Sequence, residues 1–201
     1  MESGSATFAA GSVLSYGGPI SINGGVLTLS TGTAKAFGSL TMSSGTVTGS
    51  DNLTFTGTHN WTGGTLSGAG TATFNGPVNF VGGSSRNVAK ATTFNGNVSM
   101  AAGSLFTGGS TLTVQAGRTW TMGGSGSSLY DGTFVNNGTF KFSGTGVGYL
   151  SYPSAAGPDS FVNNGQMDVE SSRLTVYGDG THSGDFSVSS GAALEWYSDA
   201  D

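Results

Sequence analysis

The 201-residue chain contains no cysteine and few prolines or charged residues. Without cysteine, no disulfide can stabilise the fold, and the ligands typical of structural zinc sites are missing. The four prolines and the lack of a Gly-X-Y period exclude collagen. Charged residues make up 8% of the chain, against about 25% in average proteins. They form no basic stripe, so we expect no nucleic-acid partner.

Long apolar runs are also absent, and none approaches the roughly 18 residues that would suggest a transmembrane helix. We therefore expect no membrane insertion of this segment. Residues 1–4 contain neither a basic region nor an apolar region of a signal peptide. This favours either a cytosolic protein or a piece of a longer secreted chain.

Glycine is abundant, with 37 residues, and aromatic residues number 21 (12 Phe, 6 Tyr and 3 Trp). So much glycine disfavours helices, because each glycine costs about 1 kcal/mol in a helix interior. The hydrophobic content of 35% argues against charge-driven disorder. Charge is uneven, since residues 131–201 contain nine acidic and two basic residues. This acidic third either keeps the protein in solution or attracts cations, and the first interpretation is the simpler one.

An internal repeat of about 20 residues is visible when Thr71–Phe80 is compared with Ala91–Met100, where five of ten positions are identical. Two apolar columns extend this register, with one step of 19 residues and one of 27. The first column contains Phe55, Phe74, Phe94, Val114, Phe134 and Phe161. The second contains Trp61, Phe80, Met100, Trp120, Phe140 and Met167. A repeat of this period predicts a stack of structural units.

Short alternating segments rich in Thr, Val and Phe predict strands, and Gly, Asn and Ser clusters between them predict tight corners. Any single Asn-Gly pair, such as Asn75-Gly76, would also suit a β-hairpin in a meander or sandwich. A register held over several steps instead favours a parallel right-handed β-solenoid (β-helix) with about 20 residues per coil. We predict one all-β domain over 1–201, with nine or ten coils and a length of roughly 45–50 Å.

The 27-residue step between Phe134 and Phe161 predicts a loop insertion near 146–159. Insertions in solenoids emerge on one face, which is often the working face. Tyr149 and Tyr152 lie in this segment and are expected to be free to contact a ligand. The alternative is a corner extension with no role in binding.

Reactive motifs are weak, and we predict no catalytic residue, metal or cofactor. His59 and His182 are the only histidines, and neither belongs to a recognisable nucleophile triad. Asp168 and Glu170 stand two residues apart, so on a strand they point to the same face. Such a pair could serve glycoside chemistry or bind calcium, but ordinary solvated acids are the favoured interpretation.

The segment Leu53–Gly68 contains the phrase Trp-Thr-Gly-Gly-Thr and resembles the β-strand repeats of bacterial autotransporter passengers. Phe134–Phe140 and Gly180–Leu194 resemble spacer repeats of large secreted adhesins and haemagglutinin-like proteins. The resemblance implies a cell-surface or secreted β-solenoid but no particular ligand. We expect a structural or adhesive stalk or passenger segment without catalysis, whose partner is a host or neighbouring-cell glycan or protein.

Two other functions stay open from the sequence. A self-assembling extracellular fibre is one, because open solenoid ends can associate head to tail. Recognition or cleavage of a glycan along the face of Asp168 and Glu170 and the segment of Tyr149 and Tyr152 is the other.

Overall fold

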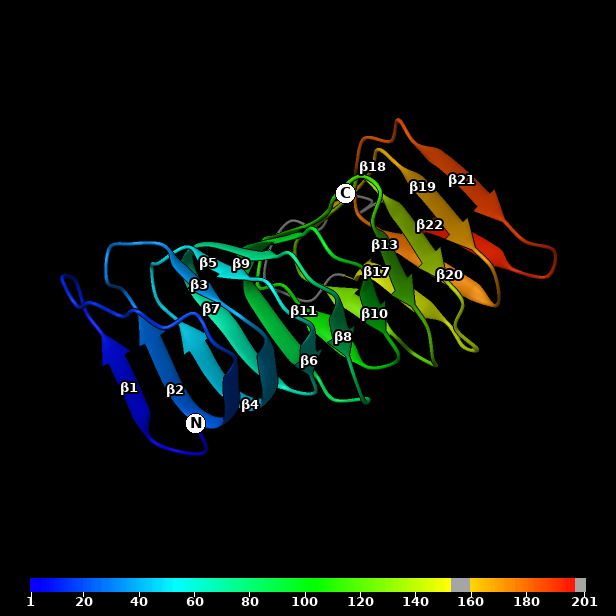
Figure 1. The fold of residues 1–201 in the computed structure, drawn as a ribbon. Helices are drawn as coiled ribbons and strands as arrows, with labels where there is room; N and C mark the ends of the chain where they lie inside the picture. The colour runs from blue at the N-terminus through cyan, green and yellow to red at the C-terminus, as the bar shows by residue number, and fades with distance from the viewer. Residues whose placement is uncertain (153–159, 198–201) are drawn as a thin grey trace.

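The computed structural model describes residues 1–152 and 160–197, and over these residues the chain contains strands and no helix. All strand pairs are parallel, and equivalent strands in successive coils lie about 20 residues apart. The chain is therefore a β-solenoid of about nine turns, as the repeat predicts. Figure 1 shows the coils following one another from the N-terminal β1 to the C-terminal β21 and β22.

Each full coil has three strand segments, which form three faces of the solenoid. Face 1 contains β3 (Lys35–Phe37), β5 (Leu53–Phe55), the end of β7 (Gly64–Phe74), the end of β9 (Arg86–Phe94), β12 (Thr111–Val114), β15 (Thr133–Asn136) and β18 (Ser160–Asn163). Face 2 contains the start of β2 (Ile20–Leu29), the start of β4 (Leu40–Thr48), β6 (His59–Trp61), β8 (Val78–Phe80), β10 (Val98–Met100), β13 (Thr119–Met122), β16 (Thr139–Phe142), β19 (Gln166–Val169) and β21 (Asp185–Val188).

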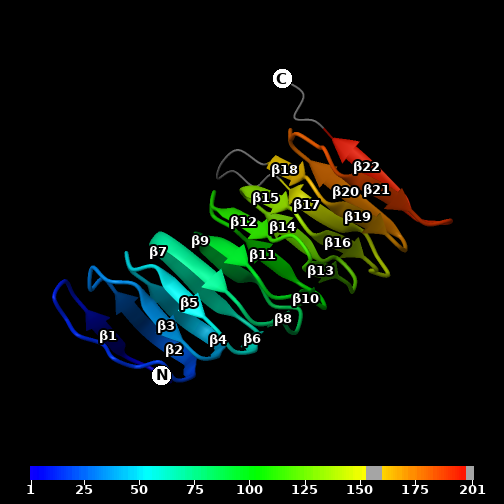
Figure 2. The ribbon, with the colours of Figure 1, turned by 45° about the horizontal axis from the view of Figure 1, so that its top comes forward.

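Face 3 contains β1 (Ser5–Phe8), the ends of β2 and β4, the starts of β7 and β9, β11 (Ser104–Phe106), β14 (Ser128–Tyr130), β17 (Gly148–Tyr152), β20 (Arg173–Tyr177) and β22 (Ala193–Tyr197). Figure 2 shows the same succession of coils along one axis from a second direction. Strands β2, β4, β7 and β9 continue round a corner from one face to the next, so the three faces are joined.

The core is a column of stacked side chains inside the coils. All twelve residues of the two predicted columns are buried, each at most 2% exposed. On face 1 the rings of Phe55, Phe74 and Phe94 stack with centroids 4.8 and 5.6 Å apart. Aromatic pairs in this geometry stabilise a structure by about 0.5–1.5 kcal/mol beyond the area they bury.

The predicted register is correct on face 1 as far as Val114, which pairs with Phe94. The next step, from Val114 to Phe134, is wrong, whereas Phe134 pairs with Phe161 as predicted. Val114 pairs with Asn136 in the next coil, and Phe134 pairs with Leu112 instead. The apolar position has therefore moved two places along the strand.

Face 2 has the same displacement one step earlier, because Met100 pairs with Met122 rather than with the predicted Trp120. The cause is a longer corner in the coil of β12 and β13. There a turn over Gln115–Arg118 is closed by the Arg118 N–H, which donates to the Gln115 carbonyl at 3.1 Å. Gly117 has a φ of 74° in this turn, a conformation that suits glycine.

The predicted insertion near 146–159 is only partly described. Its residues 148–152 form strand β17 of face 3 rather than a loop. Residues 153–159 lie outside the described residues. The prediction that Tyr149 and Tyr152 stand free on a loop is therefore wrong, because strand pairing places both on a sheet.

The Asn-Gly pairs form the corner between faces 1 and 2. The Asn95 side chain donates to the Asn75 side-chain oxygen at 2.8 Å, and Asn164 donates to Asn137 at 2.9 Å. The following glycines lie so close to the previous coil that a Cβ atom on Gly96 would stand 2.1 Å from the Gly76 carbonyl oxygen. Close approach of stacked backbones, and not a positive φ, explains glycine at this corner.

Candidate functional site

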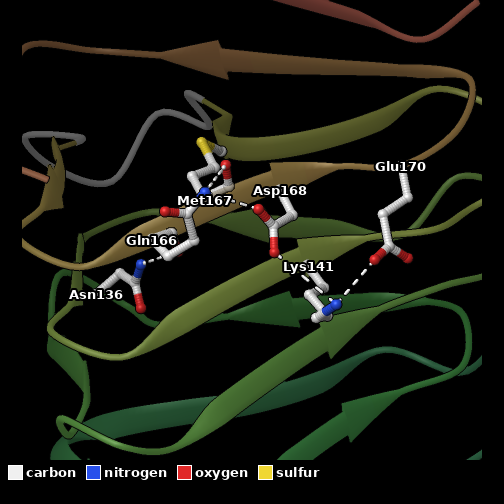
Figure 3. Close-up of polar contacts among 6 residues, drawn as sticks. All are labelled: Asn136, Lys141, Gln166, Met167, Asp168 and Glu170. Carbon is white, nitrogen blue, oxygen red and sulfur yellow. Dashed lines mark hydrogen bonds and ion pairs between the residues drawn. The ribbon is translucent and has the colours of Figure 1, made fainter. Parts of the chain in front are cut away.

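The predicted acid pair lies on the outer side of face 2 and binds one lysine. Asp168 on β19 and Glu170, which directly follows that strand, both extend toward Lys141 of β16, as Figure 3 shows. The Lys141 Nζ atom lies 2.8 Å from Glu170 Oε1 and 3.8 Å from Asp168 Oδ2. Asp168 Oδ1 also accepts a hydrogen bond from Gln166 Nε2 at 2.7 Å. The expectation that both carboxylates share one face is therefore confirmed.

The chemistry of this cluster is that of an ion pair between neighbouring strands. The hydrogen bond and charge of Glu170, with a smaller contribution from Asp168, raise the pKa of Lys141, so its ammonium stays charged. Glu170 is 44% exposed, and exposed ion pairs of this kind contribute little to stability. Across the described residues, no group of three or more His, Asp or Glu side chains is placed to hold a metal ion.

Tyr149 and Tyr152 lie on face 3, away from the acid pair of face 2. The structure therefore does not bring the four predicted binding residues together into one site. Tyr149 and Tyr152 contact each other, with centroids 5.3 Å apart and ring planes at 73°. Tyr152 also contacts Tyr130 and Tyr177 in the coils on either side.

These contacts belong to a continuous row of outward rings on face 3, which we call the tyrosine row. One ring comes from each of five successive coils, and Tyr149 lies beside them. The row consists of Phe106, Tyr130, Tyr152, Tyr177 and Tyr197, with centroids separated in that order by 4.6, 5.5, 4.9 and 5.3 Å. Each ring is half-buried or exposed, and Tyr197 at the end is 50% exposed.

The three coils before Phe106 have polar residues at the same place in the register of face 3. Phe106 pairs with Asn87, which pairs with Thr65, and Thr65 pairs with Thr46. The aromatic row is thus confined to the second half of the solenoid and is not required by the fold of a coil.

Sequence reasoning missed the row because successive members are separated by unequal numbers of residues. Nothing in a fixed 20-residue register places Tyr130 and Tyr177 beside Tyr152. Their position after a Leu or Val on a short strand, as in Ser128-Leu129-Tyr130, was the available signal, since side chains alternate between the two sides of a strand.

A shallow polar recess of about 150 Å³ lies at the opposite half of the solenoid, lined by residues 32–34 and 50–52. The buried carboxylate of Asp51 beside it accepts hydrogen bonds from the Thr31 N–H and hydroxyl at 2.9 and 2.8 Å and from the Gly32 N–H at 2.9 Å. Burial acts to raise the pKa of Asp51, but these bonds and the charge of Lys35 lower it on balance. The carboxylate therefore holds a corner of the chain together.

Two buried basic side chains lie inside or at a corner of the solenoid and bind carbonyl oxygens. Arg86, 1% exposed, donates to the carbonyls of Trp61, Ala102, Val81 and Gly82. Lys90, also 1% exposed, donates to the carbonyls of Gly49 and Ala69. Burial lowers the pKa of both groups. Because both bind backbone carbonyls, we assign them a structural role.

Comparison of the chain with known protein families, curated proteins and solved structures finds no match. The resemblance to autotransporter and haemagglutinin-like repeats therefore has support only at the level of the β-solenoid fold. Among the described residues there is also no helix that could cross a membrane.

Proposed function

We propose that this chain is a rigid structural segment, a stalk or passenger segment, of a bacterial cell-surface or secreted adhesin. The observation that carries the proposal is the stacking itself. Three faces of parallel strands surround a core of stacked side chains over about nine turns. Backbone hydrogen bonds between neighbouring coils run along the axis and resist bending and stretching.

The site geometry also favours a structural role over glycan cleavage. Asp168 and Glu170 bind the same lysine rather than facing each other across a cleft. Glycosidases hold two carboxylates on opposite sides of the bond that they cleave. An adhesive partner, a glycan or protein on a host or neighbouring cell, would then be bound along a face or by parts of the assembly that the segment supports.

Two measurements test the proposal. Electron microscopy of the purified protein should show stiff rods, and nine coils spaced by about 4.8 Å give a length of about 43 Å. An antibody raised against the protein should label intact cells of the source organism, and protease added to those cells should remove the label. A protein found only in the cytosol after lysis would contradict the surface location, and globular particles would contradict the stalk.

Head-to-tail self-association is a second candidate function, supported by the last coil. Phe186 and Val188 continue the inward column of Met167 and Val169, yet they are 40% and 46% exposed. An open parallel edge with apolar inward residues is suited to pairing with the first coil of a second copy.

Sedimentation velocity over a range of concentrations tests this second function. Association should increase with concentration and should fall in a Phe186→Ser/Val188→Thr variant. Val81→Thr is the matched control, because Val81 is equally exposed but lies on a corner in mid-solenoid. A wild type that stays monomeric at high concentration would exclude self-association without affecting the stalk proposal.

A further inference from the structure

Five of the six tyrosines of the chain belong to the outer side of face 3, and the remaining one is Tyr16. The large aromatic side chains buried in the core are Phe and Trp. Tyrosine is thus concentrated on the outer side of the coils, where these residues are half-buried or exposed. Ring packing between strands would be served equally well by phenylalanine, which occupies the first place of the row at Phe106.

Contacts within the row join the coils of β14, β17, β20 and β22. Tyr152 is central, with ring centroids 4.9 Å from Tyr177, 5.3 Å from Tyr149 and 5.5 Å from Tyr130. Tyr177 continues the row to Tyr197 at 5.3 Å. When one carbon–carbon bond joins two phenol rings, the distance between their centroids is the sum of two ring radii and the bond length. This sum is only slightly less than the centroid distances in the row. Rotamer motion of exposed side chains covers the difference on a picosecond-to-nanosecond timescale.

We propose that the tyrosine row is a site of oxidative cross-linking, in which dityrosine bonds join adjacent coils. The oxidant is of the class of a peroxidase acting with hydrogen peroxide. Two neighbouring tyrosines each lose one electron and the phenolic proton. The resulting phenoxyl radicals combine through their ortho carbons and form one carbon–carbon bond. Each ring then moves its ortho hydrogen to the oxygen and regains a phenol, while the two electrons and two protons reduce one hydrogen peroxide to two waters.

The principal bond joins Tyr152 to Tyr177, which have the shortest separation among the tyrosine pairs of the row. Tyr152 is 36% exposed and therefore accessible to an oxidant. A bond between these residues closes a loop of one coil and restricts the unfolded chain, as a disulfide would. The chain has no cysteine, so a disulfide cannot lock neighbouring coils together, whereas a dityrosine bond can.

The proposal is tested on the purified full chain with a plant peroxidase and hydrogen peroxide, at low protein concentration. We expect dityrosine fluorescence in the monomer band, a mass loss of two hydrogens per bond, and linked peptides that contain Tyr152 and Tyr177. The treated protein should unfold at a temperature higher by about 5 °C or more. The cross-linking reaction does not depend on the proposed surface function, so it can be observed even if the tests of that function contradict it.

Conservative variants separate cross-linking from simple ring packing. Tyr152→Phe keeps the ring but removes the phenol, so the monomer signal should fall several-fold while the untreated protein unfolds as before. Tyr152→Phe/Tyr177→Phe should reduce the signal to background, because each ring contact between tyrosines of face 3 involves Tyr152 or Tyr177. Tyr16→Phe is the matched control, since Tyr16 is 49% exposed but lies far from the row in the chain.

Three results would overturn the proposal. Dityrosine found only in covalent dimers would show coupling between molecules rather than between coils. Addition of oxygen to the rings without loss of hydrogen would show oxidation without coupling. A monomer signal that survives in Tyr152→Phe/Tyr177→Phe but disappears in Tyr16→Phe would place the reaction outside the row.

Discussion

The imidazole Nδ1 of His59 accepts a hydrogen bond from the backbone N–H of Leu40 at 2.9 Å, one coil earlier. His59 is fully buried, and its Nε2 atom has no hydrogen-bond partner. Its ring lies in the core against Phe55 and Phe74, at centroid distances of 5.8 and 4.9 Å. Burial lowers the pKa of His59 from 6.5 to about 4, so the ring is neutral at physiological pH.

This burial predicts a loss of stability in mild acid. Below pH 6.5 the unfolded chain takes up a proton at His59 that the folded chain does not take up until about pH 4. The free energy of unfolding should therefore fall as the pH decreases from 7 to 4, by at most about 3 kcal/mol from this group, and level off below that. Denaturant unfolding at a series of pH values measures the slope.

Two variants assign this slope to His59. His59→Leu introduces at position 59 the residue type that the neighbouring coil has at Leu40. It should flatten the pH dependence of the free energy of unfolding between pH 7 and 4. It should also lower stability at pH 7 by about 1–3 kcal/mol, because the Leu40 N–H loses its acceptor. His182→Asn, which copies the Asn163 with which His182 is aligned, should keep most of the slope. An unchanged slope in His59→Leu would contradict the assignment.

Arg86 predicts a second effect, on stability at neutral pH. One guanidinium group donates to four carbonyl oxygens of the corners around it. Lysine has the same charge but a single nitrogen, so Arg86→Lys should lower the free energy of unfolding by about 1–3 kcal/mol. Guanidinium denaturation with tryptophan fluorescence measures the change. Arg118→Lys, at an exposed corner, should have little effect, and equal effects would show that geometry at Arg86 is unimportant.

How far the sequence could predict the fold is clearest at the phenylalanine column. Phe55, Phe74 and Phe94 repeat at nearly constant spacing because the differences in corner length between their coils compensate one another. The structure stacks the three rings as predicted. The prediction is wrong at the step from Val114 to Phe134 because the corner Gln115–Arg118 is longer. An apolar residue two places further along the strand still faces inward, so the pattern of apolar residues does not reveal the shift.

The candidate sites were less predictable than the fold. The shared face of Asp168 and Glu170 follows from strand alternation, but the contact with Lys141 depends on the 27-residue step between coils, which no local pattern determines. The tyrosine row depends on the lengths of several corners at once. Arg86 gave no signal, because a buried arginine that binds carbonyls looks in the sequence like any surface arginine.

Glycine at the corner between faces 1 and 2 predicts a third effect. A Cβ atom on Gly96 would lie 2.1 Å from the carbonyl oxygen of Gly76, so two coils would have to separate. Gly96→Ala should lower the free energy of unfolding by about 2 kcal/mol or more. Gly83→Ala is the matched control, because no atom lies within 4 Å of its Cβ position and its φ is not positive. Thermal unfolding followed by circular dichroism compares the two, and equal losses would contradict the close-approach explanation.

A pair of buried asparagines predicts a fourth effect. Asn136 and Asn163 continue the inward column of Val114 and are fully buried. The Asn136 Nδ2 donates to Asn163 Oδ1 at 2.7 Å and to the Gln166 carbonyl at 2.9 Å. Asn163 Nδ2 in turn donates to the Asp185 carbonyl at 3.1 Å, so the two amides link three successive coils.

Asn136→Val introduces the side chain found one coil earlier, yet it should lower the free energy of unfolding by about 1–3 kcal/mol. The reason is that Asn163 Oδ1 loses its donor in a dry interior. The double variant Asn136→Val/Asn163→Val should be less destabilised than the sum of the single variants, because one buried oxygen is removed together with its partner. Urea unfolding of the wild type, the two single variants and the double variant gives the coupling energy between the two asparagines directly. Additive losses would show that each asparagine acts through its backbone contacts alone.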